Sequence, residues 1–245
     1  MSFSEDEIER YARHLVLAEI GGPGQQRLRA ARVGLVGMGG VGAPAALYLA
    51  AAGVGTLRLI DHDDVALSNL QRQIIFARTD IGGAKVEAAE ARLTALNAHV
   101  EIEAAPERLT PDTAAWLLDG CDVVIDGTDD FHTRFAANAA CVAAGIPLVS
   151  GALGRWSGQV GVFRGRPCYR CLVSDVPPDA ETCARVGVVS PVPGVVGSMA
   201  ALEAIKLITG AGEPLEGRLL LYDGLAGTAR TVRLAADPAC PVCAA

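Results

Sequence analysis

A glycine-rich turn between a strand-like run and a helix-like run constrains the fold of this chain most. The apolar stretch 33–36 is followed by Gly37-Met-Gly-Gly-Val-Gly42, which matches G-x-G-x-x-G, and then by an Ala/Leu-rich stretch, 43–52. Glycine suits such a turn because φ is positive there and because a phosphate must approach bare backbone. The following helix offers free N–H groups to an anion. We therefore predict a nucleotide-binding turn at Gly37, Gly39, Gly40 and Gly42 in preference to a merely structural one.

The strands that follow predict a parallel sheet. A second strand, 56–60, ends at Asp61, where an acid is placed to bind ribose hydroxyls. Further strands are predicted at 100–104, 121–126 and 147–149, with helical patterns between them. Strands that alternate with helices form parallel sheets with right-handed crossovers.

The pattern changes after Gly151. Strands at 159–163, 218–222 and 228–234 have no intervening crossovers, and a helix is predicted at 198–209. We predict an α/β, Rossmann-like, doubly wound and mostly parallel sheet that is extended by antiparallel C-terminal strands. Without a Pro/Ser linker, 1–245 is expected to be one domain, with a nucleotide-binding core at about 30–150 and the extension at about 151–245.

The N-terminal segment predicts a capped helix. Ser4 and Glu7 form a capping box, and Ile8, Tyr11 and Leu15 fall on one face. Arg13 lies off that stripe. A glycine loop is expected at 21–24, before a short helix at 25–31 that leads into the first strand.

Charge and composition exclude several classes of function. The net charge of −7 and the pI near 5.1 argue against a nucleic-acid or membrane role. The N-terminus is acidic, unlike a signal peptide, and the longest apolar run, 195–208, contains Glu203 and Lys206. We expect a cytoplasmic protein, in which the seven cysteines serve as metal ligands, nucleophiles or buried thiols.

Four cysteines form two C-x-x-C pairs, Cys168/Cys171 and Cys240/Cys243. Together they supply the four thiolates of a tetrahedral structural zinc site, with no open position for catalysis. The metal would tie the C-terminal tail to the sheet extension. Redox pairs and unliganded core cysteines are the alternatives, and the redox reading is weakened because neither pair opens a helix in a βαβ context.

The other three cysteines differ in their surroundings. Cys121 and Cys141 occupy a strand start and an apolar helix, which indicates buried packing residues. Cys183 follows a segment typical of an exposed loop, so it is either a reactive thiol or an incidental loop cysteine.

Polar residues at the strand ends predict a second constellation. Asp129 follows the fourth strand and should share a crevice with Asp61 and the glycine turn. Beside phosphates, Asp129 fits a Mg²⁺ ligand, with a solvated turn or a helix cap as the alternative. Arg72 and Lys85 are cations available to a polyphosphate, unless they are ordinary surface charges. Lys85 is one of only two lysines and opposes the dipole of its helix.

These pieces together resemble the MoeB/ThiF/HesA family, bacterial relatives of ubiquitin-activating enzymes, over nearly the whole chain. The matching stretches are Arg10-Tyr-Ala-Arg13, Gly37 to Gly42, Asp61-His-Asp63, Ser68-Asn-Leu-Gln-Arg-Gln73, Lys85-Val-Glu87, Gly127-Thr-Asp129, Cys168-Tyr-Arg-Cys171, Thr182-Cys183 and the final C-x-x-C. Asp130 stands where many members have Asn, and it could either tune the metal or cap the next helix.

The resemblance implies a homodimeric adenylyltransferase that uses ATP and Mg²⁺. Its substrate would be the C-terminal Gly-Gly carboxylate of a small ubiquitin-like sulfur carrier, and its products an acyl-adenylate and pyrophosphate. By matching the family motifs, the resemblance implies that Asp61 binds the ribose, that Asn69, Arg72 and Lys85 bind the phosphates, and that Asp129 ligates Mg²⁺. It also implies that Arg13 reaches the partner subunit's triphosphate. Cys183 matches a loop cysteine that takes part in sulfur transfer in some members.

Several alternatives stay open at this point. A nicotinamide-dependent oxidoreductase would use the same glycine turn but would leave Arg72, Lys85 and the paired cysteines without roles. An inactive, zinc-stabilised carrier-docking protein would not need the set of charged residues. The pathway, molybdopterin or thiamin synthesis or another, is not specified. Longer relatives carry a rhodanese-like domain, so we expect a separate sulfur donor, a rhodanese or a cysteine desulfurase.

Overall fold

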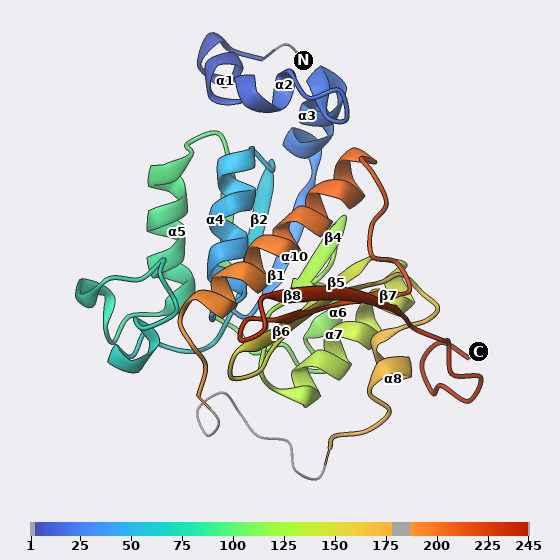
Figure 1. The fold of residues 1–245 in the computed structure, drawn as a ribbon. Coiled ribbons are helices and arrows are strands. Elements are labelled where there is room, and N and C mark those ends of the chain that lie inside the picture. Colours follow the sequence, from blue (N-terminus) through green and yellow to red (C-terminus); the bar gives the residue numbers. More distant parts are fainter. Residues whose placement is uncertain (1–2, 178–186, 245) are drawn as a thin grey trace.

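A single eight-stranded sheet organises the protein (Figure 1). The computed structural model describes residues 3–177 and 187–244. The strands are β1 (Arg32–Val36), β2 (Thr56–Ile60), β3 (Glu101–Ala105), β4 (Val123–Asp126), β5 (Leu148–Leu153), β6 (Ser157–Phe163), β7 (Arg218–Asp223) and β8 (Thr228–Arg233). Their order in the sheet is β3-β2-β1-β4-β5-β6-β7-β8.

The sheet has a parallel part and an antiparallel part. Strands β1 to β5 pair in parallel, and β5 to β8 pair antiparallel. The predicted fold class is therefore confirmed. Strand β5 belongs to both parts and is longer than the predicted stretch 147–149, because beyond Ser150 it continues as half of a hairpin with β6.

Helices cover both faces of the sheet. The helices are α1 (Glu5–Arg10), α2 (Ala12–Leu15), α3 (Gly21–Ala30), α4 (Gly42–Ala52), α5 (Lys85–Leu96), α6 (Ala114–Leu117), α7 (Phe131–Ala144), α8 (Tyr169–Leu172) and α10 (Pro191–Thr209), with 3-10 turns η1 (Leu67–Asn69) and η2 (Arg78–Asp80). Side chains of α4, α5 and α10 form one apolar cluster with the sheet, and α6, α7 and α8 contribute to a second cluster (Figure 1).

Helix α10 is longer than the apolar run expected from the sequence. By length and composition alone it could cross a membrane, but half of the residues in that window are buried inside the protein. The helix contacts α4, β5 and β6. Lys206 lies 2.5 Å from Glu203, whose other carboxylate oxygen accepts from the backbone of Leu215. These contacts are those of a core helix that covers a sheet.

The N-terminal helices lie at the amino ends of the parallel strands (Figure 1). The capping box of Ser4 and Glu7 is present. The expected continuous apolar stripe is wrong, because the chain breaks at Tyr11 and leaves Ile8 49% exposed. Tyr11 is buried instead, and its hydroxyl accepts from Asn97 Nδ2 at 2.9 Å. The predicted glycine loop at 21–24 is also wrong, since these residues form the first turn of α3.

Candidate nucleotide site and cysteine cluster

A cavity of about 430 Å³ opens where the parallel strands end. Val36 of β1 is in register with both Ile60 of β2 and Asp126 of β4, so the residues that follow these strands meet at one edge. The strand order reverses between β1 and β4, which is where open α/β sheets bind ligands. Every predicted nucleotide-site residue except Gly42 lines this cavity. These residues are Gly37, Gly39, Gly40, Asp61, Asn69, Arg72, Lys85 and Asp129.

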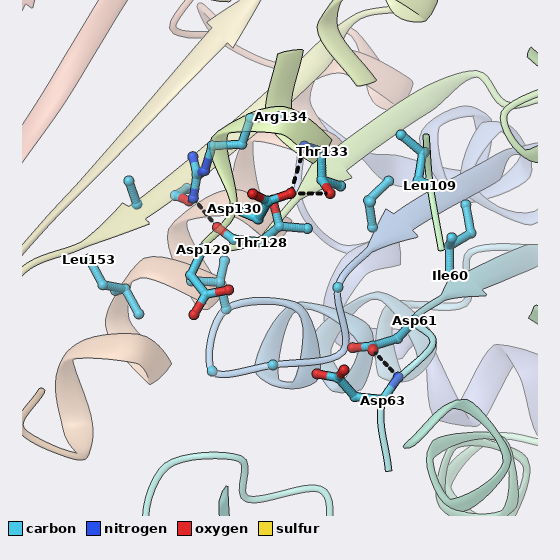
Figure 2. A pocket seen from close by; sticks show the side chains of 18 of the residues that line it. Ile60, Asp61, Asp63, Leu109, Thr128, Asp129, Asp130, Thr133, Arg134 and Leu153 are labelled. Atoms are coloured by element: carbon cyan, nitrogen blue, oxygen red, sulfur yellow. Dashed lines mark hydrogen bonds between the residues drawn. The ribbon is translucent and has the colours of Figure 1, made fainter. Parts of the chain in front are cut away.

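The glycine turn owes its shape to two close approaches. Gly37 has a φ of 86°, which side-chain-bearing residues rarely adopt. A Cβ on Gly42 would lie 1.9 Å from the Gly37 carbonyl oxygen, so α4 can begin there only with glycine. The carboxylate of Asp61, 8% exposed, accepts from the N–H of Met38 at 2.7 Å. It also accepts from the N–H of Asp63 at 2.9 Å (Figure 2). Asp61 thereby fixes the glycine turn to the end of β2.

Lys85 reaches into the cavity from the first turn of α5. Its side chain is buried, and Nζ lies 2.8 Å from Asp63 and 3.9 Å from Asp61. Burial works to raise the pKa of Asp63, but the hydrogen bond and charge of Lys85 outweigh it and hold the pKa below its ordinary value. The two carboxylates explain how a lysine is tolerated at a helix N-terminus.

The irregular loop between β2 and α5 supplies two further cavity residues. Asn69 accepts from the N–H of Ala66 at 3.0 Å, which closes the 3-10 turn η1. Arg72 follows, and its guanidinium donates to the carbonyl of Ser68 at 3.2 Å. Both side chains line the same cavity as Lys85, so the loop brings a second cation to this edge of the sheet.

Asp129 and Asp130 have different surroundings although they are adjacent. Asp130 is the N-cap of α7, and it accepts from the N–H and the hydroxyl of Thr133 at 2.9 and 2.7 Å (Figure 2). Asp129 is exposed, and its carboxylate is directed away from that cap. Of the two roles expected for Asp130, tuning the metal or capping the helix, its side chain performs the second.

A buried ion pair beneath this loop was not anticipated from the sequence. Asp126, 1% exposed, lies 3.4 Å from the guanidinium of Arg134 and accepts from the Ser150 hydroxyl at 2.9 Å. Arg134 also donates to the carbonyls of Thr128 and Gly151. The pair therefore joins β4, β5 and α7 directly behind Asp129. The available signal was an arginine that directly precedes the mostly apolar stretch 135–144 of α7.

Arg13 is exposed on α2, at the opposite end of the parallel strands from the cavity of its own chain (Figure 1). The N-terminal helices are held there, since Arg10 donates to the carbonyl of Leu96 at the end of α5. Cys183, the predicted loop thiol, lies outside the described residues.

The four paired cysteines form one cluster. Sγ of Cys168 lies 3.6 Å from Sγ of Cys240, and Sγ of Cys171 lies 3.4 Å from Sγ of Cys243. All four sulfurs are within 4.8 Å of one another. Four thiolates at about 2.3 Å from a tetrahedral zinc ion would be about 3.8 Å apart, so the cluster fits Zn²⁺. Cys168 is the N-cap residue of the one-turn helix α8, but α8 follows antiparallel β6 and lies outside any βαβ unit, as expected from the sequence.

Asn138 of α7 supports the cluster from behind. Its Nδ2 donates to Sγ of Cys168 at 3.5 Å, and its Oδ1 accepts from the N–H of Tyr169 at 2.8 Å. Such outer contacts orient a metal ligand. The remaining described cysteines, Cys121 and Cys141, are buried, as predicted for packing residues. Burial raises the pKa of Cys121 to about 11 and that of Cys141 to about 12.

The sheet, the glycine turn, the cationic loop and the cysteine cluster define a nucleotide-binding α/β protein with a four-cysteine metal site. This chain belongs to the ThiF family, which matches residues 11–242.

Named relatives match over almost the whole chain. The sulfur carrier protein adenylyltransferase of Thermus thermophilus is 44% identical and covers 99% of this chain and 93% of its own. The molybdopterin-synthase adenylyltransferase of Escherichia coli is 43% identical and covers 98% of each. A crystal structure of Escherichia coli MccB with AMPCPP and MccA has a TM-score of 0.85 at 23% identity, over 100% of this chain and 76% of that one. This last likeness shows the fold alone.

Proposed function

We propose that the protein is an ATP-dependent adenylyltransferase that activates the C-terminal glycine carboxylate of a small ubiquitin-like sulfur-carrier protein. The observation that carries the proposal is a single cavity that joins the glycine turn, Asp61, Arg72, Lys85 and Asp129 in a chain similar from end to end to sulfur-carrier adenylyltransferases.

Each cavity residue has a role that its position supports. Asp61, at the tip of β2, would hold the ribose, and the glycine turn would hold the phosphates at the start of α4. Asn69, Arg72 and Lys85 would bind the triphosphate. Asp129 would ligate Mg²⁺, which suits an exposed carboxylate beside the phosphate-binding turn.

The chemistry explains this choice of residues. A carrier carboxylate attacks the α-phosphate, the bond to the β-phosphate breaks, and acyl-adenylate and pyrophosphate are formed. The reaction joins two anions, so charge neutralisation and in-line positioning lower the barrier. Mg²⁺ supplies part of that neutralisation when bound. Arg72 and Lys85 supply the rest, and Lys85 must exchange its contact with Asp63 for the phosphates.

The two alternative functions have less support. A nicotinamide-dependent oxidoreductase would not need two cations on the loop and on α5, and the named relatives are adenylyltransferases. A protein that only docks a carrier would not need Asp129, Arg72 and Lys85 in one cavity.

The finer parts of the proposal concern assembly and pathway. We propose a homodimer in which Arg13 reaches the partner subunit's triphosphate, Zn²⁺ held by Cys168, Cys171, Cys240 and Cys243, and one domain over residues 1–245. A sulfur donor, a rhodanese or a cysteine desulfurase, would act on the acyl-adenylate, with Cys183 as the thiol to test. We further propose that the protein acts in the cytoplasm. Its carrier would belong to molybdopterin or thiamin synthesis.

Pyrophosphate exchange tests this function directly. Purified protein, Mg²⁺, ATP and labelled pyrophosphate should form labelled ATP only when a carrier with a C-terminal Gly-Gly is added. A carrier that lacks its last glycine is the matched control and should support no exchange. Absence of exchange with every small carrier of the same cell, in protein that binds ATP, would contradict the proposal.

A further inference from the structure

One cavity residue contains a polar atom for which the described part of the chain provides no partner. Gln73 is 4% exposed, and its amide oxygen Oε1 is buried without a hydrogen bond. Among the described residues, the only other buried side-chain nitrogen or oxygen in this condition is Nε of Arg170. A buried acceptor that lacks a donor lowers the stability of the folded state, because its hydration is lost without compensation. Functional sites are the typical places where proteins keep such a loss of stability.

The position of Gln73 places this oxygen next to the proposed ATP site. Its side chain lines the same cavity as the glycine turn. A Cβ added to Gly39 would lie 3.7 Å from Nε2 of Gln73, and no other neighbouring atom is within 4 Å. The Gln73 amide therefore borders the open face of the phosphate-binding turn.

The side-chain amides of neighbouring residues in the same loop have hydrogen-bond partners within the protein. Oδ1 of Asn69 accepts from the N–H of Ala66 at 3.0 Å. Nε2 of Gln71 donates to the carbonyl of Val188 at 3.1 Å. The unpaired oxygen of Gln73 is thus not a general property of this loop, and among the described residues the cavity is the one direction from which a partner can come.

The missing partner must be a hydrogen-bond donor, because Oε1 is an acceptor. The phosphates of ATP offer only acceptors. An O–H group is offered by a ribose hydroxyl and by a water molecule bound to Mg²⁺. We infer that Gln73 is a further nucleotide-binding residue, whose Oε1 accepts from such an O–H group while Nε2 faces the phosphates. The inference rests on the proposed ATP site and adds a residue to it.

Gln73→Met is the informative substitution, because methionine keeps the length of the side chain and removes both polar ends. Without ligand, the variant should melt about 2–8 °C higher than the wild type, since the unpaired buried group is gone. Its affinity for MgATP, measured by calorimetry, should fall by about 3- to 10-fold, as expected for one hydrogen bond. A purely structural glutamine would give a lower melting temperature and an unchanged affinity.

Two further titrations identify the donor. If it is a ribose hydroxyl, the wild type should prefer ATP over 2′-deoxy-ATP or 3′-deoxy-ATP, and Q73M should lose about 3- to 10-fold of that preference. If it is a metal-bound water, the ribose preference should be the same in both proteins, and Q73M should require more Mg²⁺ for the same ATP affinity.

Two more variants complete the experiment. Gln26→Met makes the same change at an exposed position of α3 outside the cavity. It should leave the affinities for MgATP and for the deoxy-ATP analogues unchanged. Gln73→Glu keeps the acceptor, so it should retain the ribose or metal preference even if Q73M does not fold. Wild-type ATP affinity in Q73M at every Mg²⁺ concentration would overturn the inference. Failure of the wild type itself to bind ATP would instead overturn the proposed function.

Discussion

At the scale of single residues, Asp129 and Asp130 separate function from stability. Asp129→Ala should abolish pyrophosphate exchange, because the proposed Mg²⁺ ligand is lost, while unfolding in urea changes by less than about 0.5 kcal/mol. Asp130→Ala is the matched control and should lower the free energy of unfolding by about 0.5–2 kcal/mol through loss of the N-cap. Near-normal exchange by the Asp129 variant would assign the metal to another carboxylate.

The same pair predicts a pH dependence of stability. Burial works to raise the pKa of Asp130, but hydrogen bonds from Thr133 and His132 outweigh it and hold the pKa below its ordinary value of 3.8. A lowered folded-state pKa means that the cap stabilises the protein above this value and is lost as the pH falls through the folded-state pKa. Urea midpoints of the wild type and of Asp130→Ala should therefore converge below about pH 4. A constant difference down to pH 2 would show that the charge of Asp130 contributes nothing.

The sequence could predict residues whose role is set by the backbone around them. The glycine turn is of this kind, because the φ of Gly37 and the approach of Gly42 to the Gly37 carbonyl are local requirements. The sequence could not distinguish Asp129 from Asp130, since adjacent carboxylates have the same chemistry until their directions are known. It could not reveal the unpaired oxygen of Gln73, which depends on everything packed around it.

At the scale of elements, tertiary contacts decided what local patterns could not. The stripe of Ile8, Tyr11 and Leu15 is a sound helical pattern, but α1 ends before Tyr11, whose buried hydroxyl accepts from Asn97, a residue far along the chain. The pairing of β4, β5 and α7 through Asp126 and Arg134 was equally invisible, because the partners approach only when the sheet forms.

This buried pair should stabilise the packing of α7 on the sheet. Arg134→Met leaves the carboxylate of Asp126 buried and unpaired, and should lower the free energy of unfolding by about 3–5 kcal/mol. The double variant Asp126→Asn/Arg134→Met removes both charges and should regain a large part of that loss. Equal urea midpoints for the single variant and the wild type would show that the pair does not hold these elements together.

The four-cysteine cluster connects elements that are distant in sequence. Cys240→Ser should release the proposed zinc and lower the free energy of unfolding by about 4 kcal/mol or more, as is usual for a lost structural metal. Metal analysis of the purified wild type should find one zinc ion per chain. Cys141→Ser is a control that removes a buried thiol outside the cluster and should leave the zinc content unchanged. Wild-type protein without zinc, purified without chelators, would contradict the assignment.

At the scale of the whole molecule, the position of Arg13 predicts shared sites. Arg13 lies at the amino ends of the parallel strands and the cavity at their carboxyl ends, so an arginine that acts on ATP must come from another subunit (Figure 1). Arg13→Ala and Asp129→Ala should each be nearly inactive. Mixed in equal amounts with subunit exchange, they should recover about a quarter of wild-type exchange activity, because each heterodimer has one intact site.

Subunit exchange must be demonstrated independently, for example by mass spectrometry of differently labelled chains. A mixture of Arg13→Ala with itself under the same treatment is the control and should remain inactive. If labelled heterodimers form and activity does not return, Arg13 does not complete a neighbouring site.

The cysteine cluster also has a consequence for how the protein is made. Its two halves are 72 residues apart in the chain, with α10, β7 and β8 between them. At a ribosomal rate of roughly 5–20 residues per second, the second pair of thiols is synthesised about 4–14 s after the first. During that interval Cys168 and Cys171 are an incomplete chelate, open to oxidants and to competing metals. If the proposed zinc site forms, we expect the yield of mature chains to depend on the cell's supply of reductant and zinc during translation.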